Sequence, residues 1–128
     1  MLISIAVDFR HANVATRERF HLSPERILRL HTTALPAGVR ELVAVATCNR
    51  SEIYAWTAGH DPASTVAFDD AVDAIARVWM GNRAGAKALL GVAQRRAGLD
   101  VARRVLRIAT GLESQVMGDG QILGQLRQ

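Results

Sequence analysis

Residues 42–56 read LVAVATCNRSEIYAW, and this stretch decides the fold because it encodes two strands and the turn between them. The apolar run 42–46 is too short for a helix and is β-branched at alternate positions, which predicts a buried strand within a longer strand over 40–46. Residues 53–56 predict the next strand. The short interval between the two favours a hairpin with Cys48 in the loop at its tip.

Cys48 is the only cysteine among the 128 residues, and it stands beside the polar side chains of Thr47, Asn49 and Arg50. A fixed positive charge near a thiol favours the thiolate, which is the nucleophilic form. The alternative is a structural cysteine, because lone cysteines are most often small buried apolar residues. The polar neighbours favour a reactive thiol, but the residues alone leave both interpretations open.

The composition is that of a globular domain, with 49% hydrophobic residues in a chain long enough to bury one core. No uncharged stretch is long enough to span a membrane, and the chain begins without the basic region of a signal peptide. A single cysteine argues against a disulfide framework, so we expect a cytoplasmic protein. The four histidines are scattered and no second thiol is present, so we expect no metal site.

Hydrophobic spacing predicts further elements on both sides of the hairpin. Residues 2–7 predict a strand, and residues 8–16 are polar and irregular. Ser23 and Pro24 predict the start of a helix. Four positions of that helix are expected to face the core: Ile27, Leu28, Leu30 and His31.

The second half of the chain predicts mainly helices. Residues 64–80 form the first, and residues 83–90 predict a short helix or a helix followed by a strand. From residue 99 onward, apolar residues recur at helical spacing and predict a helix with one apolar face. That face consists of Leu99, Ala102, Leu106, Ala109 and Leu112. Residues 119–128 predict the start of another helix.

Positive charge is concentrated late in the chain, whose formal net charge is +4. Residues 83–107 contain seven basic residues and one acidic residue, Asp100. A basic helix around Arg95 to Arg107 could face the phosphates of an RNA. The alternative is an ordinary solvated helix face, and the pattern by itself favours that interpretation.

Two longer motifs resemble one known family. Residues 46–54 read ATCNRSEIY, and residues 111–125 read GLESQVMGDGQILGQ. Both are similar to motifs of the N-terminal catalytic domain of glutamyl-tRNA reductases, and Arg17-Glu18-Arg19 is similar to an early segment of the same domain. The resemblance implies an α/β fold, with a small, mostly antiparallel sheet covered by helices and followed by a helical segment. It also implies a catalytic domain over 1–117 and the start of a linker helix over 118–128.

The resemblance further implies a reaction. Cys48 would take the glutamyl group of glutamyl-tRNA as a thioester, and NADPH bound by a separate domain would reduce it to glutamate-1-semialdehyde, the first step of five-carbon tetrapyrrole biosynthesis. Arg50 matches the position that holds the substrate carboxylate. The other implied substrate-binding positions are Thr47, Asn49, Ser114 and Gln121. Implied partners are a second copy, as a homodimer, and a glutamate-1-semialdehyde aminomutase that receives the product.

Two departures from the family pattern bear on activity. Arg104 stands where the family usually has a histidine, and a guanidinium cannot act as a general acid or base at neutral pH. Residues 6–13 lack the histidine and proline of the corresponding family segment, and His11 lies nearby but offset. The alternative to a reductase is therefore a divergent, non-reducing paralogue that binds charged tRNA or a partner protein.

Overall fold

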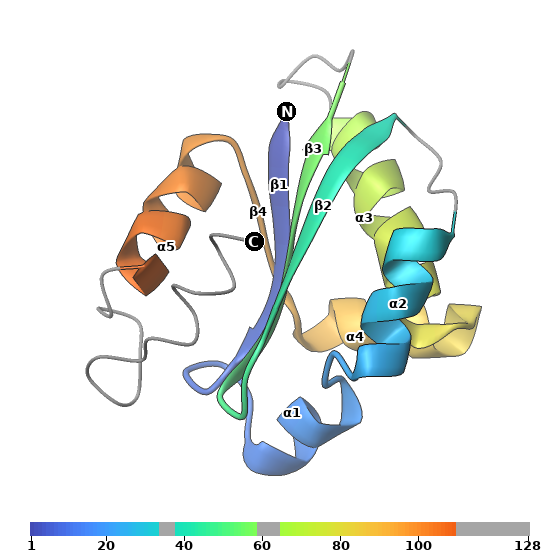
Figure 1. Ribbon diagram of the computed structural model, residues 1–128, viewed down its shortest axis with the longest axis vertical. Coiled ribbons are helices and arrows are strands. Elements are labelled where there is room, and N and C mark those ends of the chain that lie inside the picture. Colours follow the sequence, from blue (N-terminus) through green and yellow to red (C-terminus); the bar gives the residue numbers. More distant parts are fainter. Residues whose placement is uncertain (34–37, 59–64, 110–128) are drawn as a thin grey trace.

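The chain folds around one antiparallel sheet, seen in the computed structural model, which describes residues 1–33, 38–58 and 65–109 (Figure 1). The described strands are β1 (Leu2–Asp8), β2 (Val39–Ala46), β3 (Arg50–Thr57) and β4 (Gln94–Ala97). They lie in the order β2-β3-β1-β4, so that the N-terminal strand and the second half of the hairpin occupy the centre.

Helices cover both faces of this sheet. The described helices are α1 (Val14–Arg19), α2 (Pro24–Thr32), α3 (Thr65–Met80), α4 (Arg83–Val92) and α5 (Leu99–Ala109). Figure 1 shows α2, α3 and α4 against one face and α5 against the other, with α1 beside the ends of the strands. This arrangement confirms the predicted α/β class and the helix-covered antiparallel sheet, whereas the helix predicted over 119–128 lies outside the described residues.

The period of two along each strand divides the core into two parts. In β1, Ile3 and Ile5 face the larger core, which α3 and α4 complete with Trp79 and Leu89. In β3, Tyr54 faces the opposite side. There a smaller cluster joins the sheet to α5 and consists of Val45, Tyr54, Val101 and Ile108.

The hairpin prediction is confirmed, with β2 antiparallel to β3 and Ala46 opposite Ser51. Strand β3 begins at Arg50, three residues before the predicted start, so its first residues belong to the sheet rather than to the loop. The expectation of a buried β2 is wrong. Val45 is fully buried but Val43 is 41% exposed, because β2 is the outermost strand of the sheet and lacks a neighbour on one side.

Two short elements, α1 and β4, were not predicted. Helix α1 occupies part of the segment that is polar and irregular in sequence, and Asn13 caps it by accepting a hydrogen bond from the backbone N–H of Thr16 (2.9 Å). Strand β4 contains Arg95 and Arg96, so the predicted basic helix starts only at Leu99. Residues 83–92 form one helix, so of the two interpretations of 83–90 the short helix is the one observed, and β4 lies beyond that segment.

Helix α2 begins as predicted, with the Ser23 hydroxyl accepting a hydrogen bond from the Arg26 N–H (3.3 Å). Its expected core face is partly wrong. Leu30 is buried and Ile27 is half-buried, but Leu28 is 63% exposed and His31 is exposed. The reason is the turn of 100° per residue, which directs Leu28 and His31 away from the stripe that contains Leu30.

Helix α5 forms where predicted but buries a different face. Leu99 and Leu106 are exposed, whereas Val101, Arg104 and Ile108 are buried against the sheet. The buried residues are spaced by three and four positions, as a helix requires, but the central one is an arginine. A pattern search for apolar residues therefore selects the wrong face.

One arginine fastens α2 to α3. Arg29 donates from Nε to the Val78 carbonyl and from Nη2 to the Trp79 carbonyl, both at 2.7 Å. These carbonyls lie in the last turn of α3, where helical partners run out, and a cation is favourable there. Gly81 ends the helix with a positive φ of 82°, and the Arg29 guanidinium lies 3.4 Å from where a β-carbon would stand.

No described helix is long and apolar enough to cross a membrane.

Replacing Arg29 by methionine tests this clamp. The substitution keeps most of the aliphatic stem but removes both hydrogen bonds, so we expect the free energy of unfolding to fall by about 2 kcal/mol. Chemical denaturation measures the change. Arg83→Met, at an exposed position of α4, is the control and should stay within about 0.5 kcal/mol of the parent chain. Equal losses in the two variants would contradict the clamp.

Candidate functional site

The hairpin tip presents Cys48 to solvent on a short, closed turn. The Thr47 N–H donates to the Arg50 carbonyl (2.9 Å), and the Asn49 N–H donates to the Thr47 hydroxyl (3.2 Å). These bonds fix the two residues at the tip, Cys48 and Asn49, between paired strands. Cys48 is exposed, so the structural alternative of a buried apolar cysteine does not apply.

Arg50 lies directly after the tip but its side chain is buried, with only 1% exposed. It occupies the first position of β3, opposite Asp8 in β1. Its guanidinium carbon lies 5.8 Å from the centre of the Phe9 ring, and its Nη1 lies 3.8 Å from Glu52 Oε1. A single residue, Asn49, therefore separates the exposed thiol of Cys48 from the buried positive charge of Arg50.

Arg50 belongs to a group of buried polar side chains that we call the buried charge cluster: Asp8, Arg50, Glu52, Tyr54 and Arg104. Arg104 donates from Nη2 to Asp8 Oδ2 and to Glu52 Oε1, and Tyr54 donates its hydroxyl hydrogen to Glu52 Oε2. Every member is at most 6% exposed. The cluster thus joins β1, β3 and α5 through charge-assisted hydrogen bonds that are shielded from solvent.

Strand register explains how the cluster assembles. Asp8 pairs with Arg50, and Ala6 pairs with Glu52. Since alternate residues share a face, Asp8, Glu52 and Tyr54 project toward α5 together. Helix α5 then places Arg104 above them, in the middle of its buried face.

The cluster shifts the pKa values of its members. Burial by itself would raise the pKa of Asp8, but hydrogen bonds and positive charge from Arg104 and His11 outweigh it and lower that pKa below its usual 3.8. Burial followed by the charge of Glu52 raises the pKa of Tyr54. Burial opposes the charged form of Arg104, yet Glu52 and Asp8 raise its pKa above the usual value. The Asp8–Arg104 ion pair is therefore charged near neutral pH.

A cavity of about 430 Å³ opens beside Cys48, on the side of the hairpin that faces α1 and α2. Thr47, Asn49, Arg50 and Ser51 line it from the hairpin, while Arg17 and Glu18 line it from α1. The sequence singled out the segment containing Arg17 and Glu18 only through its resemblance to the family. The structure brings that segment to the thiol.

His21 also lines this cavity, although no motif or pattern in the sequence marks it. The Ser51 hydroxyl accepts a hydrogen bond from the Leu22 N–H (2.9 Å) and lies 3.4 Å from His21 Nδ1. Ser51 therefore holds the α1–α2 connection against the first residues of β3. Nothing in the local sequence signals this contact, because the two residues are thirty positions apart.

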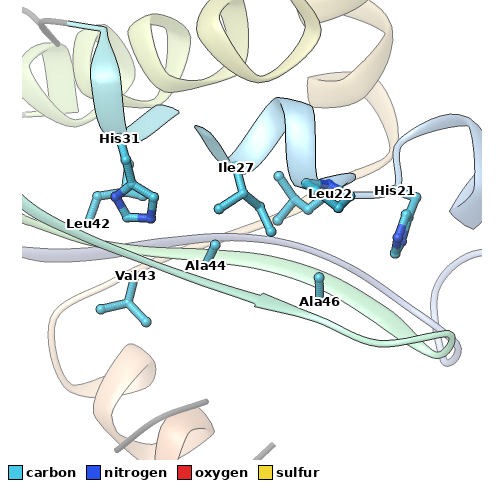
Figure 2. A pocket seen from close by; sticks show the side chains of 9 residues that line it. His21, Leu22, Ile27, His31, Leu42, Val43, Ala44 and Ala46 are labelled. Atoms are coloured by element: carbon cyan, nitrogen blue, oxygen red, sulfur yellow. The ribbon is translucent and has the colours of Figure 1, made fainter. Parts of the chain in front are cut away.

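His21 joins the Cys48 cavity to an apolar groove of about 500 Å³ between α2 and β2. Figure 2 shows Leu22 and Ile27 above Ala44 and Ala46, with His21 at one end of the groove and His31 and Leu42 at the other. The open outer side of β2 forms one wall. Within the described ranges, the groove gives the Cys48 region an apolar extension along the sheet edge.

The remaining predicted site residues have different outcomes. The structure brings Thr47, Asn49 and Arg50 together around Cys48, and it places Arg104 in the buried charge cluster. Ser114 and Gln121 lie outside the described residues. In the part of the chain that is described, no group of three or more histidine, cysteine, aspartate or glutamate residues is placed to hold a metal ion.

Comparisons with known proteins agree with the geometry. The family described as glutamyl-tRNA(Glu) reductase, N-terminal domain, matches residues 5–128. A glutamyl-tRNA reductase from Methanocella arvoryzae is 39% identical over 124 residues, covering 97% of this chain and 25% of that protein. One from Marinomonas sp. is 32% identical over 129 residues, covering 98% and 28%. The chain thus spans about a quarter of the length of these relatives.

A solved structure shares the fold. The glutamyl-tRNA reductase from Methanopyrus kandleri aligns with a TM-score of 0.63 and 24% identity, over 98% of this chain and 26% of that one.

Arg104→Met tests the buried charge cluster. The variant leaves two buried carboxylates without their common donor, and we expect a loss of about 3–5 kcal/mol in the free energy of unfolding at neutral pH. The matched control is Arg103→Met on the same helix, where the side chain is 70% exposed. Chemical denaturation should show a change within about 0.5 kcal/mol for the control. A small loss in Arg104→Met would show that the cluster does not hold α5 in place.

Asp8→Asn tests the lowered pKa. A carboxylate whose pKa is lower in the folded chain stabilises it fully above the unfolded-state value and loses that effect as pH falls through the folded-state value. We therefore expect Asp8→Asn to be less stable than the parent at neutral pH, and the difference to shrink as pH falls below about 4. Urea denaturation over this pH range measures it. A constant difference would contradict the assignment.

Proposed function

Because the chain belongs to the family of glutamyl-tRNA reductase N-terminal domains, we propose that Cys48 accepts the glutamyl group of glutamyl-tRNA. The observation that carries the proposal is the exposed thiol on a closed hairpin tip, adjacent to a buried arginine and a cavity. A rigid support of this kind lowers the cost of orienting a nucleophile toward a substrate.

The acylation step follows from thiol chemistry. The Cys48 thiolate sulfur attacks the ester carbonyl carbon, a carbon–sulfur bond forms, and the bond to the terminal ribose oxygen breaks. The ribose oxygen leaves with the tRNA and takes up a proton. The product is a thioester on Cys48, and the step requires no external oxidant or reductant.

Residues around the thiol hold the glutamyl group in this proposal. Arg50 binds the substrate side-chain carboxylate, because it matches the family position with this role and a guanidinium suits a bidentate carboxylate. Thr47 and Asn49 hold the loop and line the Cys48 cavity. The proposal also gives Ser114 and Gln121, from the second motif and outside the described residues, a role in binding the substrate.

In the complete reaction NADPH would supply hydride chemistry when bound. The described residues do not fit this cofactor, because the sheet is antiparallel throughout and the sequence has no G-x-G-x-x-G turn after a strand. We therefore assign NADPH to a separate domain and derive no step through it. In this assignment residues 1–117 are the catalytic domain and residues 118–128 begin the linker helix.

The wider setting is also part of the proposal. The reaction is the first step of tetrapyrrole biosynthesis by the five-carbon route, in the cytoplasm. The full-length protein is a homodimer, and its aldehyde product passes to a glutamate-1-semialdehyde aminomutase.

One observation favours a second function. Arg104 stands at the position of the family histidine, and its guanidinium is bound to Asp8 and Glu52 rather than free to exchange protons. A paralogue that has lost reduction, and that binds charged tRNA or a partner protein, is compatible with this arrangement. The intact Cys48 loop favours the enzyme.

A transfer assay separates the two functions. We expect the chain to acquire label from tRNA charged with labelled glutamate in the absence of NADPH, and Cys48→Ser to acquire none. Acid quenching followed by gel or mass analysis detects the label, and labelled free glutamate with uncharged tRNA is the control. Binding of the charged tRNA without label would favour the paralogue. Label that persists in Cys48→Ser would contradict the assigned nucleophile.

A further inference from the structure

A second polar cavity, of about 240 Å³, lies between β4 and α5. All of its lining residues are charged, and four of the five are arginines: Arg96, Asp100, Arg103, Arg104 and Arg107. We propose that this arginine cavity is a phosphate-binding site that receives a backbone phosphate of the tRNA. The assignment of the phosphate to tRNA rests on the proposed function, whereas the site itself rests on the geometry.

The arginines in the cavity differ in how far neighbouring carboxylates neutralise them. Arg104 is neutralised by Asp8 and Glu52 of the buried charge cluster. Arg103 has only an exposed contact with Asp100, at 3.6 Å between Nη1 and Oδ1, and such pairs contribute little in water. The cavity as a whole therefore retains a positive charge that an anion can complement.

Arg96 is the residue that points to a ligand. Its Nη1 is buried and has no hydrogen-bond partner among the described residues, and the same holds for the hydroxyl of Ser4, which is opposite Arg96 in the sheet. Buried polar atoms are almost always hydrogen-bonded, so the unpaired Nη1 of Arg96, whose side chain lines the cavity, points to an external partner. A phosphate accepts hydrogen bonds through several oxygens at once and suits the guanidinium fork.

The local backbone brings the arginines together. Gly98 has a positive φ of 67° and its N–H donates to the Leu2 carbonyl (2.8 Å), which turns the chain sharply from β4 into α5. Arg96 at the end of the strand thus faces Arg103 on the second turn of the helix across the cavity. The cavity, of about 240 Å³, is large enough for a phosphate group.

The proposed function favours an RNA phosphate over a free phosphate as the ligand. Arg104 lines the arginine cavity and is also part of the buried charge cluster that backs the Cys48 hairpin. The Cys48 cavity opens toward α1 and the arginine cavity lies under α5, so a polyanion that contacts both extends from the hairpin tip to the α5 face of the sheet. Contacts to RNA phosphates fix register and orientation without reading sequence.

Binding of uncharged tRNA specific for glutamate at several salt concentrations tests the site. We expect Arg96→Gln to weaken binding about tenfold at low salt and to reduce the slope of log K against log salt by about 1. Arg96→Lys, which keeps the charge but lacks the fork, should weaken binding less. The matched control is Arg83→Gln, an exposed position of α4 on the other side of the sheet, which should bind like the parent.

A second arm distinguishes the source of the phosphate. Inorganic phosphate is titrated into the free protein, and the arginine Nε–H signals are followed by NMR. Loss of tRNA affinity in Arg96→Gln with an unchanged melting temperature supports the proposal. Binding of inorganic phosphate at Arg96 without any effect on tRNA overturns the assignment to RNA, and no effect of Arg96→Gln on either ligand overturns the site.

These outcomes are separate from the fate of the proposed function. If Cys48 acquires no glutamyl label while tRNA still binds through Arg96, the reaction fails and the phosphate site stands. If Cys48 is labelled normally in Arg96→Gln and tRNA affinity is unchanged, the phosphate site fails and the reaction stands.

Discussion

The structure around the thiol depends on one arrangement, a single arginine shared by two carboxylates beneath a helix. Arg104 holds α5 to the two central strands through Asp8 and Glu52, and Tyr54 satisfies the remaining oxygen of Glu52. Removing charges from water is costly, so such a group is favourable only when every member has its partner. The register of β1 and β3, the position of α5 and the burial of Arg50 therefore depend on one another.

The Cys48 hairpin is held from both faces of the sheet by consecutive residues. Arg50 projects toward the buried charge cluster, whereas Ser51 projects to the opposite side and accepts the Leu22 N–H. Alternation along β3 makes this possible, since neighbouring residues of a strand point to opposite faces. The tip itself carries only Cys48 and Asn49, so the thiol can be exposed while the residues immediately after it are fixed.

The sequence patterns predicted those features that depend on interactions between residues close together in the chain. The hairpin follows from the apolar run and the short loop, and the start of α2 follows from Ser23 and Pro24. The buried face of α5 did not follow, because Arg104 is buried only through partners 52 and 96 positions away in sequence. Strand β4 has four residues, two of them arginines, and its pairing with β1 is equally non-local. The cavity lined by Cys48 and His21 is a tertiary feature for the same reason.

Arg104 also determines what chemistry this side of the site can perform. Its carboxylate partners raise its pKa further above neutrality, so it remains a cation at any physiological pH. A permanent cation can stabilise negative charge but cannot transfer a proton during the exchange of an ester for a thioester. Histidine is the side chain most often used for proton transfer. Among the described residues, the imidazoles near the hairpin are those of His11, whose Nδ1 lies 2.8 Å from Asp8 Oδ1, and His21, which lines the Cys48 cavity. Of the two, His21 is the imidazole that shares a cavity with the proposed nucleophile, Cys48.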